Sequence, residues 1–144
     1  MREIKFSYIY QHDDTGRILN KKFDIHEIEL ELMGECFIER YTLIARRQYT
    51  GLKDKNGVEI YEGDIVKWGH LPNRSECWYR VATVEMFPSL QFHILHYIDS
   101  KTLEKKKGDN HIFGFSNFIY KDTHNSLEII GNIYENPELL EQEK

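Results

Sequence analysis

Basic and aromatic side chains lie close together in the middle of the sequence, and this combination could bind a nucleic acid. Arginine and lysine attract phosphates, while exposed aromatic rings stack on bases. The residues concerned are Arg46, Arg47, Tyr49, Lys53, Lys55, Lys67 and Trp68. Acidic residues interrupt the same block at 54, 59, 62 and 64, and the whole chain has a net charge of −5. A local nucleic-acid-binding patch is therefore an alternative hypothesis, which the lysine run at 105–107 could extend as a flexible arm.

Three carboxylates near one turn could perform acid–base chemistry. Asp64 lies close in sequence to Glu59 and Glu62, and paired carboxylates can act as general acid and base. Acidic residues are also common at turns, because their side chains accept hydrogen bonds from backbone N–H groups, and this interpretation is favoured. Neither a Gly-x-Ser-x-Gly motif nor a catalytic Cys–His pattern is present. We therefore expect no catalytic residues and no enzymatic activity.

Histidines and cysteines could ligate a metal, but their spacing does not favour it. His93 and His96 are the one close histidine pair, and their odd spacing places them on opposite faces of the expected strand. No Cys-x-x-Cys, His-x-His or His-Glu-x-x-His motif occurs. Cys36 and Cys77 are too few for a disulfide framework and are expected to be thiols. We expect neither a metal nor another cofactor.

The segment at 51–57, GLKDKNG, could be a phosphate-binding loop or a hairpin. It lacks the Gly-Lys-Ser/Thr ending of phosphate loops, and no strong helix signal follows it. Asn56-Gly57 is the strongest short signal for a β-hairpin, because both residues tolerate the left-handed conformation of a tight turn. The hairpin is therefore favoured.

The bulk properties indicate one globular domain. The chain has 144 residues, of which 40% are hydrophobic, 13% aromatic and 30% charged. That length fits a single domain over residues 1–144, and the aromatic content favours β-structure. The start of the chain has no signal-peptide core, and no apolar run of membrane-spanning length occurs. A cytoplasmic protein without membrane contact is expected.

Alternating apolar residues predict a series of strands. The expected strands cover residues 4–10, 17–23, 37–47, 58–60, 65–68, 78–86, 90–98 and 127–134, with strand or short helix at 112–120. Turns are expected at 13–16, 56–57 and 62–64, and loops at 72–75 and 99–110. Two tight turns so close together are typical of strongly bent sheets or small barrels.

Two segments have helical signals. Residues 24–32 alternate as a strand would, yet Asp24 and Glu27 could also form a capping box for a helix, and we favour the strand. Near the end, Asn136 and Pro137 suit a helix start, and Leu139 with Leu140 would pack it. The predicted fold is mainly β, or β-rich α+β: a strongly bent sheet or small barrel with hairpins and a short C-terminal helix.

Three blocks of the sequence resemble the YopX family. They are residues 2–6 (REIKF), 49–68 (YTGLKDKNGVEIYEGDIVKW) and 128–140 (EIIGNIYENPELL), in that order. The resemblance implies a protein encoded by a phage or prophage and acting in the bacterial host cell. It implies no catalytic residue, because none is established for the family.

The absence of a catalytic motif, beside many aromatic residues that favour interfaces, predicts a non-enzymatic accessory protein. We expect it to bind an unknown host or phage protein or to assemble with itself. A homo-oligomer is expected because aromatic-rich edges of small sheets tend to pair with copies of themselves. A small β-barrel that binds nucleic acid is the alternative. The sequence leaves open the molecular function, the partner, the oligomer size, the stage of the phage life cycle and the strand order.

Overall fold

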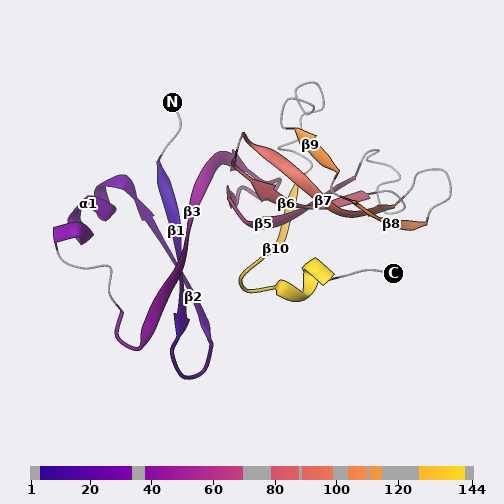
Figure 1. Cartoon of the computed structure of the whole chain (residues 1–144). Coiled ribbons are helices and arrows are strands. Elements are labelled where there is room, and N and C mark those ends of the chain that lie inside the picture. The colour runs from indigo at the N-terminus through magenta and orange to yellow at the C-terminus, as the bar shows by residue number, and fades with distance from the viewer. Residues whose placement is uncertain are drawn as a thin grey trace.

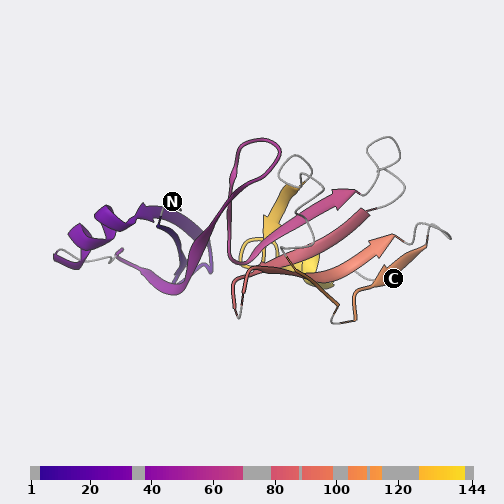
Figure 2. The ribbon, with the colours of Figure 1, turned by 90° about the horizontal axis from the view of Figure 1, so that it is seen from above.

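Two antiparallel sheets lie side by side in the computed structural model (Figure 1, Figure 2). The structure describes residues 4–33, 38–69, 79–87, 89–98, 104–109, 111–114 and 127–141. Within these residues the first sheet has the strand order β2-β1-β3-β4. Its strands are β1 (Lys5–His12), β2 (Ile18–Asp24), β3 (Tyr41–Lys53) and β4 (Glu59–Tyr61).

The second sheet has the order β10-β5-β6-β7-β8, with β9 also paired to β7. Its strands are β5 (Asp64–Gly69), β6 (Tyr79–Glu85), β7 (Gln91–Ile98), β8 (Lys105–Lys107), β9 (Ile112–Gly114) and β10 (Glu128–Asn132). The mainly β prediction is confirmed, and the described sheets do not close into a barrel. The reason is local: β4 is three residues long, and the turn at Glu62-Gly63 sends the chain into the other sheet instead of extending the first one.

Tight turns at the expected positions connect the strands. Gly16, Gly57 and Gly63 have φ of 77°, 83° and 88°, a region that favours glycine. The predicted hairpins at 13–16 and 56–57 and the turn at 62–64 are confirmed. Strand β10 also has an irregularity, a register shift between Ile129 and Gly131.

Two predictions about elements were wrong. Residues 25–33 form helix α1 (Ile25–Met33), because Asp24 and Glu27 form the capping box: each side chain accepts a hydrogen bond from the other's backbone N–H, at 2.8 and 2.9 Å. The predicted loop at 99–110 contains β8, so Lys105–Lys107 pair with β7 and are not a flexible arm. By contrast, the predicted short C-terminal helix is present, as a 3-10 helix over Pro137–Glu141. The predicted loop at 72–75, residues 115–120 and both cysteines lie outside the described residues.

The main hydrophobic core lies on one face of the second sheet and includes a residue of the first. It consists of Ile60, Val66, Trp68, Ala82, Val84, Phe92, Ile94 and Leu127. Ile60 belongs to β4, so the short strand packs the end of the first sheet onto the second. The alternation predicted for residues 90–98 is confirmed, because Phe92, Ile94 and His96 are buried while their neighbours are half-buried.

Candidate functional site

A buried ion pair joins the two sheets. Arg47 lies on β3 and Asp64 begins β5, and the distance from Arg47 Nη1 to Asp64 Oδ1 is 2.6 Å. Their side chains are only 3% and 6% exposed. Buried charges of this kind need hydrogen bonds to satisfy their remaining polar atoms.

The neighbours of the pair supply those hydrogen bonds. Arg47 donates from Nε and Nη2 to Ser7 Oγ, at 3.2 and 3.0 Å, and the Tyr61 backbone N–H donates to Asp64 Oδ2 at 2.7 Å. The Arg47 guanidinium also lies 5.6 Å from the Tyr61 ring centroid, a cation–π contact. Burial raises the pKa of Asp64 above its ordinary value, while Arg47 and the Tyr61 N–H oppose that rise by favouring the charged form. The Asp64 side chain therefore stabilises the fold through its contacts with Arg47 and the Tyr61 N–H.

Gly63 brings three chain segments together beside this pair. Its N–H donates to Val84 O at 2.8 Å, and its carbonyl accepts a hydrogen bond from Ile133 N at 3.0 Å. A Cβ at Gly63 would lie 3.4 Å from both Arg47 Cδ and a ring carbon of Tyr134. The glycine is therefore required by its positive φ and by the close approach of Arg47 and Tyr134.

Asp54 has a comparable structural role at the hairpin turn between β3 and β4. Its Oδ1 accepts hydrogen bonds from the N–H groups of Asn56 and Val58, at 2.8 and 2.9 Å, which shapes the hairpin turn. Its Oδ2 accepts from Ile129 N at 3.1 Å and so ties the hairpin to β10. Sequence reasoning treated Asp54 only as a charge that weakens a basic patch, because the partner in β10 is distant in sequence.

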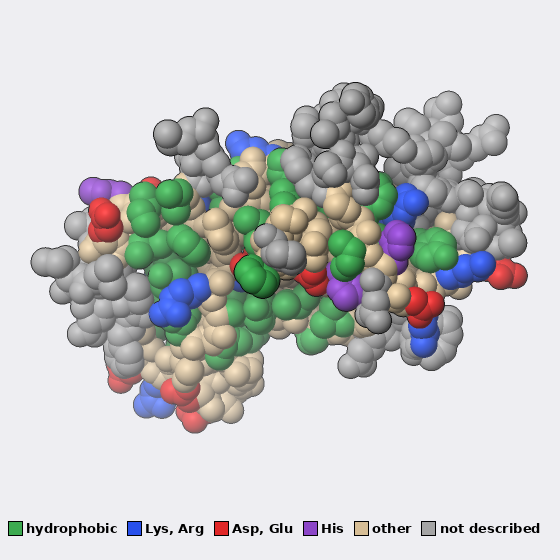
Figure 3. All heavy atoms as spheres, turned by 45° about the horizontal axis from the view of Figure 1, so that its top comes forward, with side chains coloured by type: hydrophobic (Ala, Val, Ile, Leu, Met, Phe, Trp, Pro, Cys, Tyr) green, Lys and Arg blue, Asp and Glu red, His purple; other side chains and the backbone are tan. Residues whose placement is uncertain are grey.

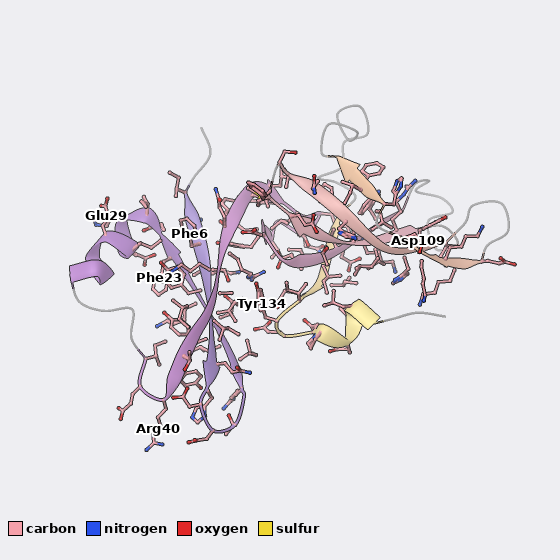
Figure 4. All side chains as sticks on the ribbon, viewed as in Figure 1. Phe6, Phe23, Glu29, Arg40, Asp109 and Tyr134 are labelled. Carbon is pink, nitrogen blue, oxygen red and sulfur yellow. The ribbon has the colours of Figure 1, made fainter. Side chains whose placement is uncertain are left out.

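An open groove of about 620 Å³ lies beside the ion pair, between β3, the β6–β7 connection and the C-terminal segment. Its described lining residues include Arg46, Arg47, Glu62, Gly63, Thr83, Val84, Glu85, Met86, Phe87, His93, Leu95, Ile133, Tyr134 and Leu140. Figure 4 places Tyr134 between the two sheets, on the segment that leads to the 3-10 turn. Apolar walls with a few charged groups are typical of binding surfaces.

The polar side chains of the groove are ordered by hydrogen bonds. Glu85 accepts from Gln91 Nε2 at 2.9 Å, and its other oxygen lies 3.1 Å from His93 Nδ1. The guanidinium of Arg46, which also lines the groove, lies 5.4 Å from the centroid of the Tyr8 ring. The groove therefore carries a cation on β3 together with the carboxylates of Glu62 and Glu85.

Phe87 is the most exposed large hydrophobic residue of the described chain. Its side chain is 85% exposed at the rim of the groove, and Leu140 on the same groove is 40% exposed. Figure 3 shows hydrophobic side chains gathered across one face of the molecule, with histidine and acidic side chains among them. Sequence reasoning missed the groove, because nothing in the pattern around Phe87 distinguishes an exposed aromatic residue from a core residue.

The structure does not gather the seven residues of the nucleic-acid hypothesis. Arg47, Tyr49 and Trp68 are buried, the last against the rings of Phe92 and Phe113. Their side chains would have to leave the core to contact a ligand. Tyr49 packs on Tyr61, with ring centroids 5.4 Å apart.

The four remaining cations lie at three places. Arg46 lines the groove, and Lys67 is half-buried on β5. Lys53 and Lys55 are exposed at the hairpin after β3, where Lys55 Nζ lies 3.6 Å from Glu128 Oε1. The hairpin carries the closest grouping of exposed cations among these residues.

The comparisons with known proteins connect this architecture to one family. A family model described as "YopX protein" matches residues 3–141. The chain is also similar to protein EF1440 from Enterococcus faecalis, known from a crystal structure, with 20% sequence identity and a TM-score of 0.37. That similarity covers 94% of this chain and 97% of the other. No curated protein matches. Within the described residues, no helix is long and apolar enough to cross a membrane.

Proposed function

We propose that this chain, which belongs to the YopX family, is a non-enzymatic accessory protein that assembles with copies of itself through the groove between its sheets. A phage or prophage origin is part of the proposal and is supported by the family resemblance. The observation that carries the proposal is Phe87, whose side chain is 85% exposed at a groove of about 620 Å³ that has both apolar and charged lining residues.

An exposed aromatic side chain beside a groove gives one surface both a projection and a recess, so two copies of that surface can fit together. In a two-fold interface each surface meets its own copy, so Phe87 of one protomer can enter the groove of its partner while the partner's Phe87 does the same. Burying a Phe side chain contributes about 1.5–3 kcal/mol, and the two-fold arrangement makes that contribution twice. Large aromatic residues are the usual energetic centres of protein interfaces.

The charges of the groove suit the same arrangement. Arg46, Glu62 and Glu85 all line the groove. A two-fold copy reverses the direction of the groove, which brings the cation of one protomer toward the carboxylates of the other. Opposite charges that face each other across an interface favour the correct register.

Sedimentation velocity over a range of protein concentrations tests the proposal. We expect the unmodified chain to associate reversibly and Phe87→Asp to raise the dissociation constant at least about tenfold, because a carboxylate in the groove would be desolvated. Ile4→Asp is the matched control, since Ile4 is 52% exposed and lies away from the groove residues. A chain that is monomeric at every concentration, or a Phe87→Asp variant that associates like the control, would refute self-assembly through this surface.

Nucleic-acid binding by the seven basic and aromatic residues between Arg46 and Trp68 remains a prediction, with less support than self-assembly. Three of them are buried, and Lys55 already lies close to Glu128. Titration with single- and double-stranded oligonucleotides at several salt concentrations would test it, because phosphate contacts weaken steeply as salt rises.

A further inference from the structure

A second cavity, of about 300 Å³, lies at the end of the second sheet remote from the first sheet. Its lining residues include three with nitrogen-bearing side chains, Arg80, Lys107 and His111. They come from β6, β8 and the segment before β9, so three separate elements meet here. Figure 4 shows Asp109 on the turn at this end of the molecule.

The turn at Gly108 fixes the rim of the cavity. Gly108 N–H donates to Leu95 O at 2.9 Å, and Ile94 N–H donates to His111 O at 2.9 Å, so both ends of the turn are held to β7. A Cβ at Gly108 would lie 1.8 Å from Ile94 O, which only glycine avoids. The backbone of Lys107 and His111, which flank this turn and line the cavity, is therefore held against β7.

Arg80 forms the inner wall. It is half-buried on β6, opposite Tyr97 in the strand register, and its guanidinium lies 5.2 Å from the Phe113 ring centroid. Burial lowers the pKa of Arg80 below its ordinary value, because a guanidinium removed from water loses hydration. Asp109 is the one acidic side chain among the described lining residues, and it is exposed at the rim.

We propose that this cavity binds a phosphate group through Arg80, Lys107 and His111. The planar guanidinium fork matches the spacing of phosphate oxygens, and a lysine adds charge from the rim. Tyr97 lines the same cavity and offers an aromatic face to a group attached to the phosphate. Asp109 opposes the anion in part. The proposal is independent of self-assembly, since the groove of Phe87 shares no lining residue with this cavity.

Isothermal titration of the full chain with inorganic phosphate, a nucleoside monophosphate and a short oligothymidylate tests the site. We expect at least one probe to bind with a millimolar or tighter dissociation constant. We expect Arg80→Gln to weaken that binding at least about tenfold, because it removes the fork. Lys107→Gln, at an exposed position, should weaken it about threefold or more even if Arg80→Gln fails to fold.

Lys21→Gln is the control, since Lys21 is an exposed lysine of β2 that lies outside this cavity and outside the seven residues of the nucleic-acid hypothesis. Equal affinity for inorganic phosphate and the monophosphate would assign recognition to the phosphate alone. Tighter binding of the monophosphate than of inorganic phosphate would show that the nucleoside is also recognised. Tighter binding of the oligothymidylate would indicate that the ligand is a single-stranded nucleic acid. All three results support the site. No binding of any probe at 10 millimolar, or Arg80→Gln and Lys107→Gln variants that bind like Lys21→Gln, would overturn the proposal.

Discussion

Arg47 and Asp64 show how a residue type can suggest a ligand while its surroundings give it another role. Arginine beside aromatic residues is typical of nucleic-acid-binding surfaces, and the sequence pattern placed Arg47 there. The structure places its guanidinium against Asp64, Ser7 and Tyr61 in the interior. These partners are far from Arg47 in sequence or on another strand, so local patterning could not identify them.

Loss of one partner of the ion pair should destabilise the fold strongly. Asp64→Asn leaves the Arg47 charge buried without a counter-charge, which typically costs about 3–5 kcal/mol of unfolding free energy. Urea unfolding of the variant and of the unmodified chain measures this loss of unfolding free energy. The matched control is Asp14→Asn, because Asp14 pairs with Arg40 at 3.6 Å while both side chains are about 70% exposed, and such pairs contribute about 0–1 kcal/mol. Equal losses in the two variants would contradict a structural role for Asp64.

Glu59 gives the fold a dependence on pH. Burial acts to raise the pKa of Glu59, but hydrogen bonds from Lys5, at 2.6 Å, and from Tyr61 outweigh it, so the pKa lies below the ordinary 4.5. The unfolded chain therefore binds the proton first as the pH falls. The stability supplied by this group is present above pH 4.5 and is lost as the pH falls through the lower, folded pKa.

Unfolding free energies measured from pH 7 down to acid should therefore fall less steeply in Glu59→Gln than in the unmodified chain. The difference between the two proteins should develop below about pH 4.5, since Gln does not titrate. Parallel pH profiles would show that the Lys5–Glu59 contact contributes nothing to stability.

At the scale of elements, sequence signals succeeded where the determinant was local. Gly16, Gly57 and Gly63 each occur where a positive φ closes a turn, and the turns at these glycines could be predicted from neighbouring residues alone. The alternation in β7 likewise reflects one buried face. The lysines of β8 could not be identified as a strand, because three exposed lysines lack an apolar pattern and pair only because Gly108 holds the chain against β7.

Helix α1 illustrates a choice between two local signals. Alternating apolar residues suggested a strand, but the reciprocal hydrogen bonds of Asp24 and Glu27 satisfy two backbone donors at the helix start. The capping hydrogen bonds favour the helix more than the alternating apolar residues favour a strand, since a strand at this position would lose both of these hydrogen bonds. Capping boxes therefore carry more information than short alternating runs in this chain.

Asp24→Ala should loosen α1 selectively. Removal of an N-cap side chain costs about 1 kcal/mol, so amide hydrogens of α1 should exchange about fivefold faster while those of β1 change little. Glu29→Ala is the control, because Glu29 is exposed within the same helix (Figure 4) and takes no part in the cap. Equal acceleration in both variants would show that the box does not set helix stability.

At the scale of the whole molecule, the two sheets are connected by side chains and by backbone. Ile60 from the first sheet enters the core of the second, the Arg47–Asp64 pair spans the junction, and Gly63 bonds to Val84 and Ile133. The groove exists because the sheets remain open at this junction instead of closing into a barrel. Sequence patterns could not show it, since its walls come from segments separated by much of the chain.

Crosslinking between copies tests self-assembly through the groove most directly. With Cys36 and Cys77 replaced by Ser, a Met86→Cys chain, which keeps Phe87, is mixed with a tagged Leu140→Cys chain and oxidised, and disulfide-linked heterodimers are measured on non-reducing gels. Disulfides form only where Cα atoms approach within about 7 Å. Phe87 seated in a partner's groove brings Met86 of the same chain near that partner's Leu140, since Met86, Phe87 and Leu140 all line the groove, and predicts at least about tenfold more heterodimer than a mixture of Met86→Cys with Lys53→Cys. Equal, background amounts of heterodimer in the two mixtures would contradict the account.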